Sequence, residues 1–151
     1  MPMHPEPHDE PRVASFRDLT TTTLYEILRL RSDVFVVEQQ CVYPDLDGRD
    51  TEPGTRHVWF ARDREIRAYL RILDDHGVER IGRVVTAKSA RGTGLAGRLL
   101  EHALEIIGNR PNVLDAQSYL TKFYTRYGFK PTGPEFIEDG IPHTPMRRPP
   151  H

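Results

Sequence analysis

VVTAKSARGTGLAGRLL, residues 84–100, is the stretch that decides the fold, because it leads a strand through glycines into a helix. β-Branched residues up to Thr86 favour an extended strand, and apolar residues from Leu95 onward recur at helical spacing. Gly92 and Gly94 let the backbone approach a ligand without a Cβ in the way. The first amides of a helix lack intrahelical partners and carry partial positive charge, so the turn predicts an anion site. The alternative is that the glycines only allow a tight turn between strand and helix and bind no ligand.

The residues before this stretch predict a helix and then a meander of three strands. Apolar side chains recur at helical spacing over about Thr23–Val37. Thr23 followed by Glu26 predicts a capping box at the start of this helix. The strands that follow are predicted at residues 57–61, 66–73 and 79–86.

The residues after it predict a long helix over 93–107, a short strand over 113–116 and a helix over 120–127. A closing hairpin follows, and its prolines, Pro142 and Pro145, predict that the last strand lies at a sheet edge. The order of elements indicates a mixed α/β (α+β) fold, with one central β-sheet flanked by helices.

Composition predicts one globular domain over residues 13–148, with mobile tails at 1–12 and 149–151. The 21 Lys and Arg balance the 22 Asp and Glu, so neither nucleic acid nor an anionic membrane is expected as the main partner. The chain shows no signal peptide and no apolar run that would span a bilayer. A single cysteine, Cys41, is typical of a reducing interior, so we expect a cytoplasmic protein.

Other ligand motifs fit less well. No lysine follows a glycine as a P-loop requires. Gly92-x-Gly94-x-x-Gly97 matches the dinucleotide fingerprint, but a meander precedes it where a doubly wound fold would place its first strand. The aspartate-rich segment from Asp45 to Asp50 imitates a calcium loop only partly, because Arg49 stands where a ligand should be. No metal is therefore expected.

Two motifs at the right separation identify a resemblance. Arg91-x-x-Gly94-x-Ala96 resembles the Gln/Arg-x-x-Gly-x-Gly/Ala signature of the GNAT superfamily of N-acetyltransferases. Downstream, FYTRYGF at residues 123–129 is similar to that family's Phe-Tyr-x-x-x-Gly-Phe segment. The segments RSDVFVVEQ, YPDLDG, RH and EDGIPH resemble the bacterial ElaA branch of this family.

The resemblance implies how acetyl-CoA would be held. Val84 and Val85 would offer main-chain contacts to the pantetheine arm, in a gap where their strand splays from its neighbour. Gly82, within the same strand, suggests a bulge or bend. The pyrophosphate would be held by the Arg91 side chain and by the amides of Gly92, Thr93, Gly94, Leu95 and Ala96.

Amine acetylation also needs an acid for the leaving thiolate and a base for the amine. Tyr124 matches the family tyrosine beside the sulfur and is the predicted acid; a core-facing aromatic is its alternative. Glu38, after an apolar run at a helix end, is the first candidate for the base, with a pKa expected to be raised by partial desolvation. Its alternative is a structural carboxylate bonded to amides or arginine.

Acceptor binding is assigned to Arg31, Asp45 and His143. Asp45, Asp47, His57 and His143 are weaker contenders than Glu38 for the base, or for acceptor contacts. Arg31 has the alternative of pairing with Glu38 or an aspartate inside the fold. Cys41 is expected to be structural, because no neighbouring cation lowers its pKa.

The resemblance predicts an N-acetyltransferase that acts on the primary amine of a small molecule, a protein lysine or a protein N-terminus. The alternative is a non-catalytic acyl-CoA-binding sensor or regulatory module. A homodimer is compatible with the sequence, which leaves the oligomeric state open.

Overall fold

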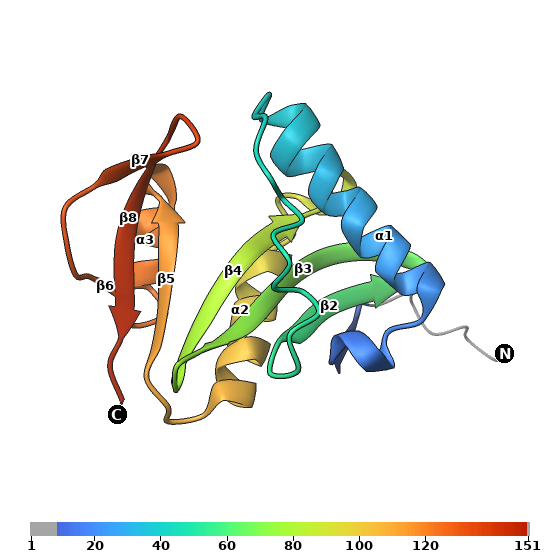
Figure 1. Ribbon diagram of the computed structural model, residues 1–151, viewed down its shortest axis with the longest axis horizontal. Helices are drawn as coiled ribbons and strands as arrows, with labels where there is room; N and C mark the ends of the chain where they lie inside the picture. The colour runs from blue at the N-terminus through green and yellow to red at the C-terminus, as the bar shows by residue number, and fades with distance from the viewer. Residues whose placement is uncertain (1–8, 151) are drawn as a thin grey trace, which may run out of the picture.

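The computed structural model describes residues 9–150 as one eight-stranded sheet with helices on both faces (Figure 1). The strands are β1 (Glu10–Ala14), β2 (Arg56–Arg62), β3 (Glu65–Asp75), β4 (Val78–Thr86), β5 (Asn112–Gln117), β6 (Lys130–Pro131), β7 (Phe136–Glu138) and β8 (Ile141–Arg148). The helices are α1 (Thr21–Arg31), the π-helical η2 (Ser32–Glu38), α2 (Leu95–Ile107) and α3 (Thr121–Thr125), with short 3-10 turns η1 (Phe16–Asp18), η3 (Lys88–Ala90) and η4 (Ser118–Leu120). The predicted mixed α/β fold is confirmed.

The sheet is split in its middle. Its order is β1-β2-β3-β4-β5-β8-β6, with β7 paired to β8 beside this path. β1 to β4 form the antiparallel meander that the sequence predicted. β4 and β5 run parallel but share only two residue pairs, Glu79 with Asn112 and Arg80 with Val113. Beyond these pairs the two strands diverge like the arms of a V (Figure 1).

The α2 face carries the larger hydrophobic core. α2 presents Leu95, Leu99, Leu100 and Ala103 to the sheet, all of them buried. The helix ends at Gly108, whose φ of 67° suits glycine. Periodicity predicted this helix well, since an apolar stripe of this width must be covered to be stable.

α1 differs in detail from the prediction. The helix begins at Thr21, and its cap is Thr20, whose side chain accepts a hydrogen bond from the Thr23 amide at 3.1 Å. The predicted capping box of Thr23 and Glu26 is therefore wrong. After Arg31 the chain continues in the wider π-helical form of η2, with the Gln39 amide donating to the Val34 carbonyl. Such segments are frequent at functional sites.

Residues 39–55 cross the α1 face of the sheet without regular structure, and ion pairs hold them there. We call these groups the ionic cluster: Arg31, Asp45, Asp47, Asp50, Arg71 and Arg83. Arg31 is fully buried and donates to Asp45 Oδ2 at 3.0 Å and Asp50 Oδ1 at 2.7 Å. The cluster thus ties the end of α1 and two central strands to this long loop.

The last strand corrects the prediction from prolines. β8 lies between β5 and β6, away from the sheet edge. The Pro145 carbonyl accepts from the Thr132 amide at 2.9 Å on the β6 side. Because the N and O of one residue point the same way in a strand, the missing N–H of Pro145 also faces β6, which ends at Pro131. The proline therefore costs the sheet no ladder bond toward β5.

The start of the chain is also more ordered than predicted. Residues 9–12 were assigned to a mobile tail, but Asp9 is buried and pairs with Arg67 at 2.9 Å. Glu10–Ala14 form β1, which pairs with β2. The rest of the predicted N-terminal tail, residues 1–8, lies outside the described residues.

We predict that Arg31→Leu lowers the free energy of unfolding by about 3–5 kcal/mol, because it leaves buried carboxylates without a cation. Arg29→Leu is the matched control: Arg29 lies on the same helix, and its side chain is 62% exposed. Urea denaturation of both variants tests this, and equal small effects would show that the ionic cluster does not hold the fold.

Candidate functional site

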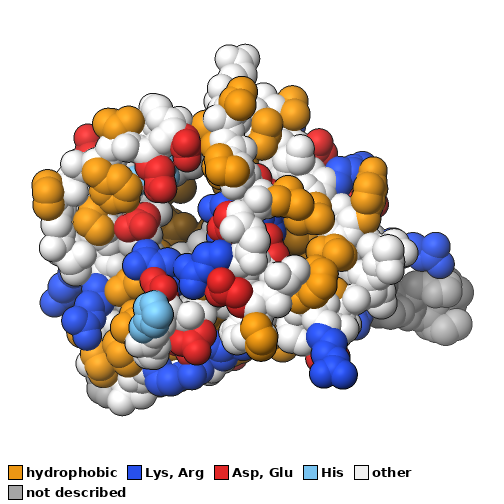
Figure 2. Space-filling model, viewed as in Figure 1, with side chains coloured by type: hydrophobic (Ala, Val, Ile, Leu, Met, Phe, Trp, Pro, Cys, Tyr) orange, Lys and Arg blue, Asp and Glu red, His pale blue; other side chains and the backbone are white. Residues whose placement is uncertain are grey.

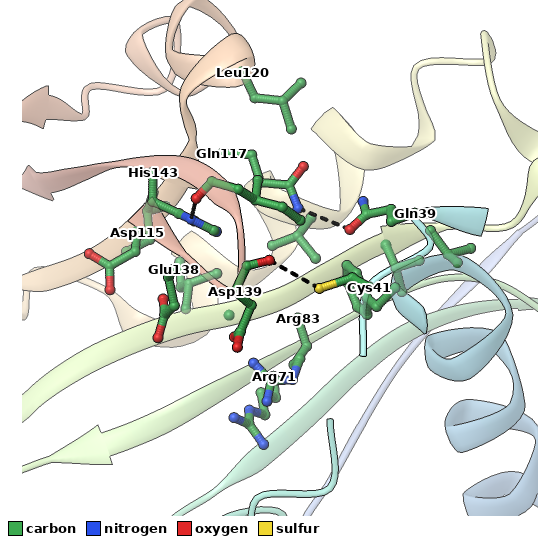
Figure 3. A pocket seen from close by; sticks show the side chains of 18 of the residues that line it. Gln39, Cys41, Arg71, Arg83, Asp115, Gln117, Leu120, Glu138, Asp139 and His143 are labelled. Atoms are coloured by element: carbon green, nitrogen blue, oxygen red, sulfur yellow. Dashed lines mark hydrogen bonds between the residues drawn. The ribbon is translucent and has the colours of Figure 1, made fainter. Parts of the chain in front are cut away.

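A cavity of about 930 Å³ fills the gap between β4 and β5. On the face seen in Figure 2 it lies in the hollow between the α1 side and the β5–β8 part of the sheet, and charged side chains surround its mouth. In Figure 3, Asp115, Glu138 and His143 stand on one wall, opposite Arg71 and Arg83. The sequence-predicted site residues that line it are Glu38, Asp47, Val84, Val85, Arg91, Ala96, Tyr124 and His143.

β4 presents its backbone to this cavity. Its ladder with β5 ends at Arg80, so from Ile81 to Thr86 the side facing β5 is open within the described chain. The predicted irregularity is present, since the pairing with β3 shifts between Tyr69 and Arg71. The left-handed residue is not Gly82 but its neighbour Arg83, with φ of 53°. Arg83 pairs with Asp45 at 2.9 Å, so the ionic cluster offsets this strain.

The turn before α2 is open to an anion. Gly92 and Gly94 have φ of 78° and 76°, and an added Cβ at either would meet nothing within 4 Å. α2 begins at Leu95, two residues later than predicted, and no side chain caps it. The first amide with a helical partner is that of Arg98, which donates to the Gly94 carbonyl at 3.2 Å. The amides of residues 95–97 therefore remain without helical partners, as the first amides of a helix must.

Arg91 extends from this turn to Glu38 at the end of η2. Its Nη1 and Nη2 donate to the two carboxylate oxygens at 2.6 and 2.5 Å. The hydrogen bond from Arg91 lowers the pKa of Glu38, which corrects the expected rise. The reason is that the carboxylate is 38% exposed and paired with a cation, whereas desolvation had been expected to dominate.

Tyr124 is the buried phenol of the cavity. It is 5% exposed and packs edge-on against Phe123 and Phe129. Burial, together with the nearby Tyr119, raises the pKa of Tyr124, so the hydroxyl is protonated at neutral pH. A protonated hydroxyl in such a place can act as a hydrogen-bond or proton donor.

Arg31 and Asp45, which the sequence suggested for acceptor binding, do not line the cavity. Both are buried in the ionic cluster, so Arg31 adopts its alternative role of pairing with an aspartate inside the fold. His57 is fully buried, with Nδ1 2.7 Å from the Tyr69 hydroxyl and Nε2 3.0 Å from the Asp50 carbonyl. Burial also lowers its pKa. These three residues act on the cavity only through the elements they hold.

Two contacts that the sequence did not predict connect the cavity walls. The Cys41 thiol donates to the Asp139 carbonyl at 3.3 Å, and Gln117 Nε2 donates to Gln39 Oε1 at 3.4 Å (Figure 3). Each joins the chain just after η2 to the β5–β8 half of the sheet. The sequence predicted the Asp139-Gly140 turn from its own residues. It could not predict the contact with Cys41, because Cys41 lies 98 positions away in the chain.

Residues 9–150 contain no group of three or more His, Cys, Asp or Glu side chains placed to hold a metal ion. No helix there is long and apolar enough to cross a membrane.

Comparisons with known proteins place this geometry in a family. The acetyltransferase (GNAT) domain family matches residues 31–149. A UPF0039 protein of Mycobacterium tuberculosis is 50% identical over 138 residues, which cover 88% of each chain. Protein ElaA of Escherichia coli K12 is 40% identical over 138 residues, covering 87% of this chain and 90% of that one.

Solved structures place the chain in the same family. An acyl-CoA N-acyltransferase from Pseudomonas aeruginosa superposes with a TM-score of 0.90 at 42% identity, over 93% of this chain and 99% of that one. The crystal structure of Escherichia coli ElaA gives a TM-score of 0.88 at 37% identity, over 93% of this chain and 99% of that one. The chain therefore belongs to the acetyltransferase (GNAT) domain family, a family of acyl-CoA-dependent acyltransferases.

Proposed function

We propose that this protein transfers the acetyl group of acetyl-CoA directly to a primary amine. The main support for the proposal is the short junction of β4 and β5, where only two residue pairs join the strands and a cavity opens beyond them. The start of α2, which no side chain caps, and the protonated Tyr124 both lie at this cavity. The similarity to an acyl-CoA N-acyltransferase of Pseudomonas aeruginosa supports the reaction class.

The donor would lie along β4. Val84 and Val85 line the cavity, and main-chain groups of this part of β4 would bond to the pantetheine amides as a neighbouring strand would. Amides from Gly92 to Ala96 would hold the pyrophosphate, with the Arg91 guanidinium exchanging Glu38 for a phosphate oxygen. Binding this remote group positions the thioester, which supplies the activated acetyl carbonyl.

Tyr124 would act at the sulfur. When the amine nitrogen bonds to the carbonyl carbon, the carbon–sulfur bond breaks and the thiolate needs a proton or a hydrogen bond. The Tyr124 hydroxyl is held protonated by burial, lines the cavity and is therefore available as donor.

The mouth of the cavity favours a cationic acceptor. Each arginine that lines the cavity is paired with a carboxylate: Arg49, Arg71, Arg80, Arg83 and Arg91. Glu138 and Asp139 also line it, and neither has an ion pair within residues 9–150. Their uncompensated charge attracts amines that carry further positive charge, such as polyamines, or lysines within basic peptides.

The direct test of this function is release of the coenzyme A thiol from acetyl-CoA with spermidine, free lysine, a lysine-rich peptide and a glutamate-rich peptide as acceptors. We expect acceptor-dependent release, with the basic acceptors faster than the acidic one. Binding of acetyl-CoA without release for any acceptor would instead favour the non-catalytic acyl-CoA-binding module.

We predict that Tyr124→Phe lowers kcat by about 100-fold while leaving coenzyme A affinity nearly unchanged, because only proton donation is lost. Tyr127→Phe is the matched control, since this neighbouring tyrosine does not line the cavity. Steady-state kinetics and calorimetric titration with coenzyme A check this. Equal losses of turnover and affinity in Tyr124→Phe would assign Tyr124 to packing.

We predict that Gly94→Ala weakens coenzyme A binding by about tenfold, or about 1.4 kcal/mol, because the new methyl group stands where the anion approaches the amides. Gly108→Ala at the other end of α2 is the control: it also has positive φ and open space around its Cβ position. Gly94→Ala should cost about 1–2 kcal/mol of stability through its left-handed backbone. Gly108→Ala should cost more, because φ of 67° with ψ of −134° is a conformation that only glycine adopts readily. Unchanged affinity in Gly94→Ala would remove the phosphate role of this turn.

A further inference from the structure

The proposed reaction needs a group that takes a proton from the acceptor. An alkyl amine, with a pKa of about 10, is mostly protonated at neutral pH and must lose a proton to attack. A base for this step must line the cavity and keep a lone pair free. Each candidate from the sequence can be tested against these two requirements.

Glu38 and Asp47 are proposed from the sequence and line the cavity, but cations occupy the oxygens that would have to accept a proton. Both oxygens of Glu38 accept hydrogen bonds from Arg91, which also lowers its pKa. Asp47 pairs with Arg71 at 2.5 Å and with Arg83 at 3.3 Å. Burial is the largest single effect and would raise the pKa of Asp47. The hydrogen bonds from Arg71 and the Arg49 amide, together with the charges of Arg71 and Arg83, outweigh burial and hold the pKa far below its ordinary value. A carboxylate stabilised so strongly as an anion is a weak proton acceptor.

Asp45 and His57 fail the first requirement. Neither lines the cavity, and both are buried within or beneath the ionic cluster. Both ring nitrogens of His57 are already engaged, by Tyr69 and by the Asp50 carbonyl.

His143 meets both requirements. It lies in β8, opposite Gln117 of β5 and Phe136 of β7, and its side chain lines the cavity. Its Nδ1 lies 2.8 Å from the Ile141 carbonyl oxygen. A carbonyl oxygen can only accept, so Nδ1 must carry the proton in this contact. The neutral ring therefore keeps its lone pair on Nε2.

The surroundings of His143 also suit proton transfer. The ring stacks on Phe136, with centroids 5.7 Å apart and planes 22° from parallel, which fixes its orientation. The carboxylates of Asp115 and Glu138 stand on the same wall of the cavity (Figure 3). These carboxylates place negative charge beside the path by which a cationic acceptor would reach His143.

We infer that His143 Nε2 is the proton acceptor for the amine, an inference that rests on the proposed acetyl transfer. His143 Nε2 takes one proton from the ammonium form of the acceptor, which leaves a neutral amine. The amine nitrogen then bonds to the carbonyl carbon, the carbon–sulfur bond breaks, and the nitrogen releases its second proton to solvent. The thiolate receives the Tyr124 proton. Solvent afterwards removes the proton from His143 and restores that of Tyr124, so the two residues return to their starting states.

The kinetic test compares His143→Ala with wild type, using the fastest amine among spermidine, lysine and the lysine-rich peptide. We expect kcat to fall by about 100-fold, coenzyme A affinity to stay unchanged, and added imidazole to restore part of the rate. With methoxyamine, which is uncharged at neutral pH, the loss should be much smaller. His102→Ala, a histidine on α2 that does not line the cavity, is the control and should match wild type.

Three outcomes separate the alternatives. Wild-type turnover in His143→Ala would overturn the role of His143 and leave the acetyl transfer standing. An equal loss with alkyl amines and methoxyamine, without imidazole rescue, would assign His143 to acceptor binding or packing. Transfer by wild type to none of the acceptors would remove the proposed function, and the role of His143 with it.

Nitrogen-15 NMR of the imidazole gives a readout that does not depend on activity. The neutral His143 ring should carry its proton on Nδ1, the less common tautomer of free histidine. A neutral ring protonated on Nε2 would contradict the assignment. His143→Ala identifies the signal.

Discussion

The rest of the structure depends on the short parallel junction between β4 and β5. Two residue pairs join the halves of the sheet, and beyond them the strands separate around a cavity. A sheet that stops pairing leaves backbone groups without ladder partners, which is unfavourable unless a ligand or water satisfies them. The same edge is therefore both the weak point of the fold and the place where an extended ligand can bond to backbone.

The ionic cluster and the contacts across the cavity stabilise this open arrangement. Arg31, Arg71 and Arg83 fasten the loop of residues 39–55 over the α1 face, and Arg83 does so from a left-handed position within β4. On the other side, Cys41 and Gln39 reach the β5–β8 half of the sheet. The cavity is thus held from both halves of the sheet, although only two residue pairs join β4 to β5.

Local features of the site could be predicted from sequence, and long-range ones could not. Residues that are close in sequence determine the turn at Gly92 and Gly94 and the apolar stripe of α2. Residue patterns and backbone chemistry therefore predicted both. Glu38 and Arg91 lie 53 positions apart, and no local pattern indicates that they pair. Arg31 was misassigned for the same reason, because burial depends on the folded loop. His143 was recognised as a candidate, but its tautomer depends on where the Ile141 carbonyl points.

Residue-resolved amide hydrogen exchange, measured with and without coenzyme A, tests most directly whether the gap between β4 and β5 holds the donor. We predict slower exchange on binding at the amides of Val84 and of residues 92–96, with β1 and β2 unchanged. Binding without protection at these amides, or with protection confined to other parts of the sheet, would contradict it.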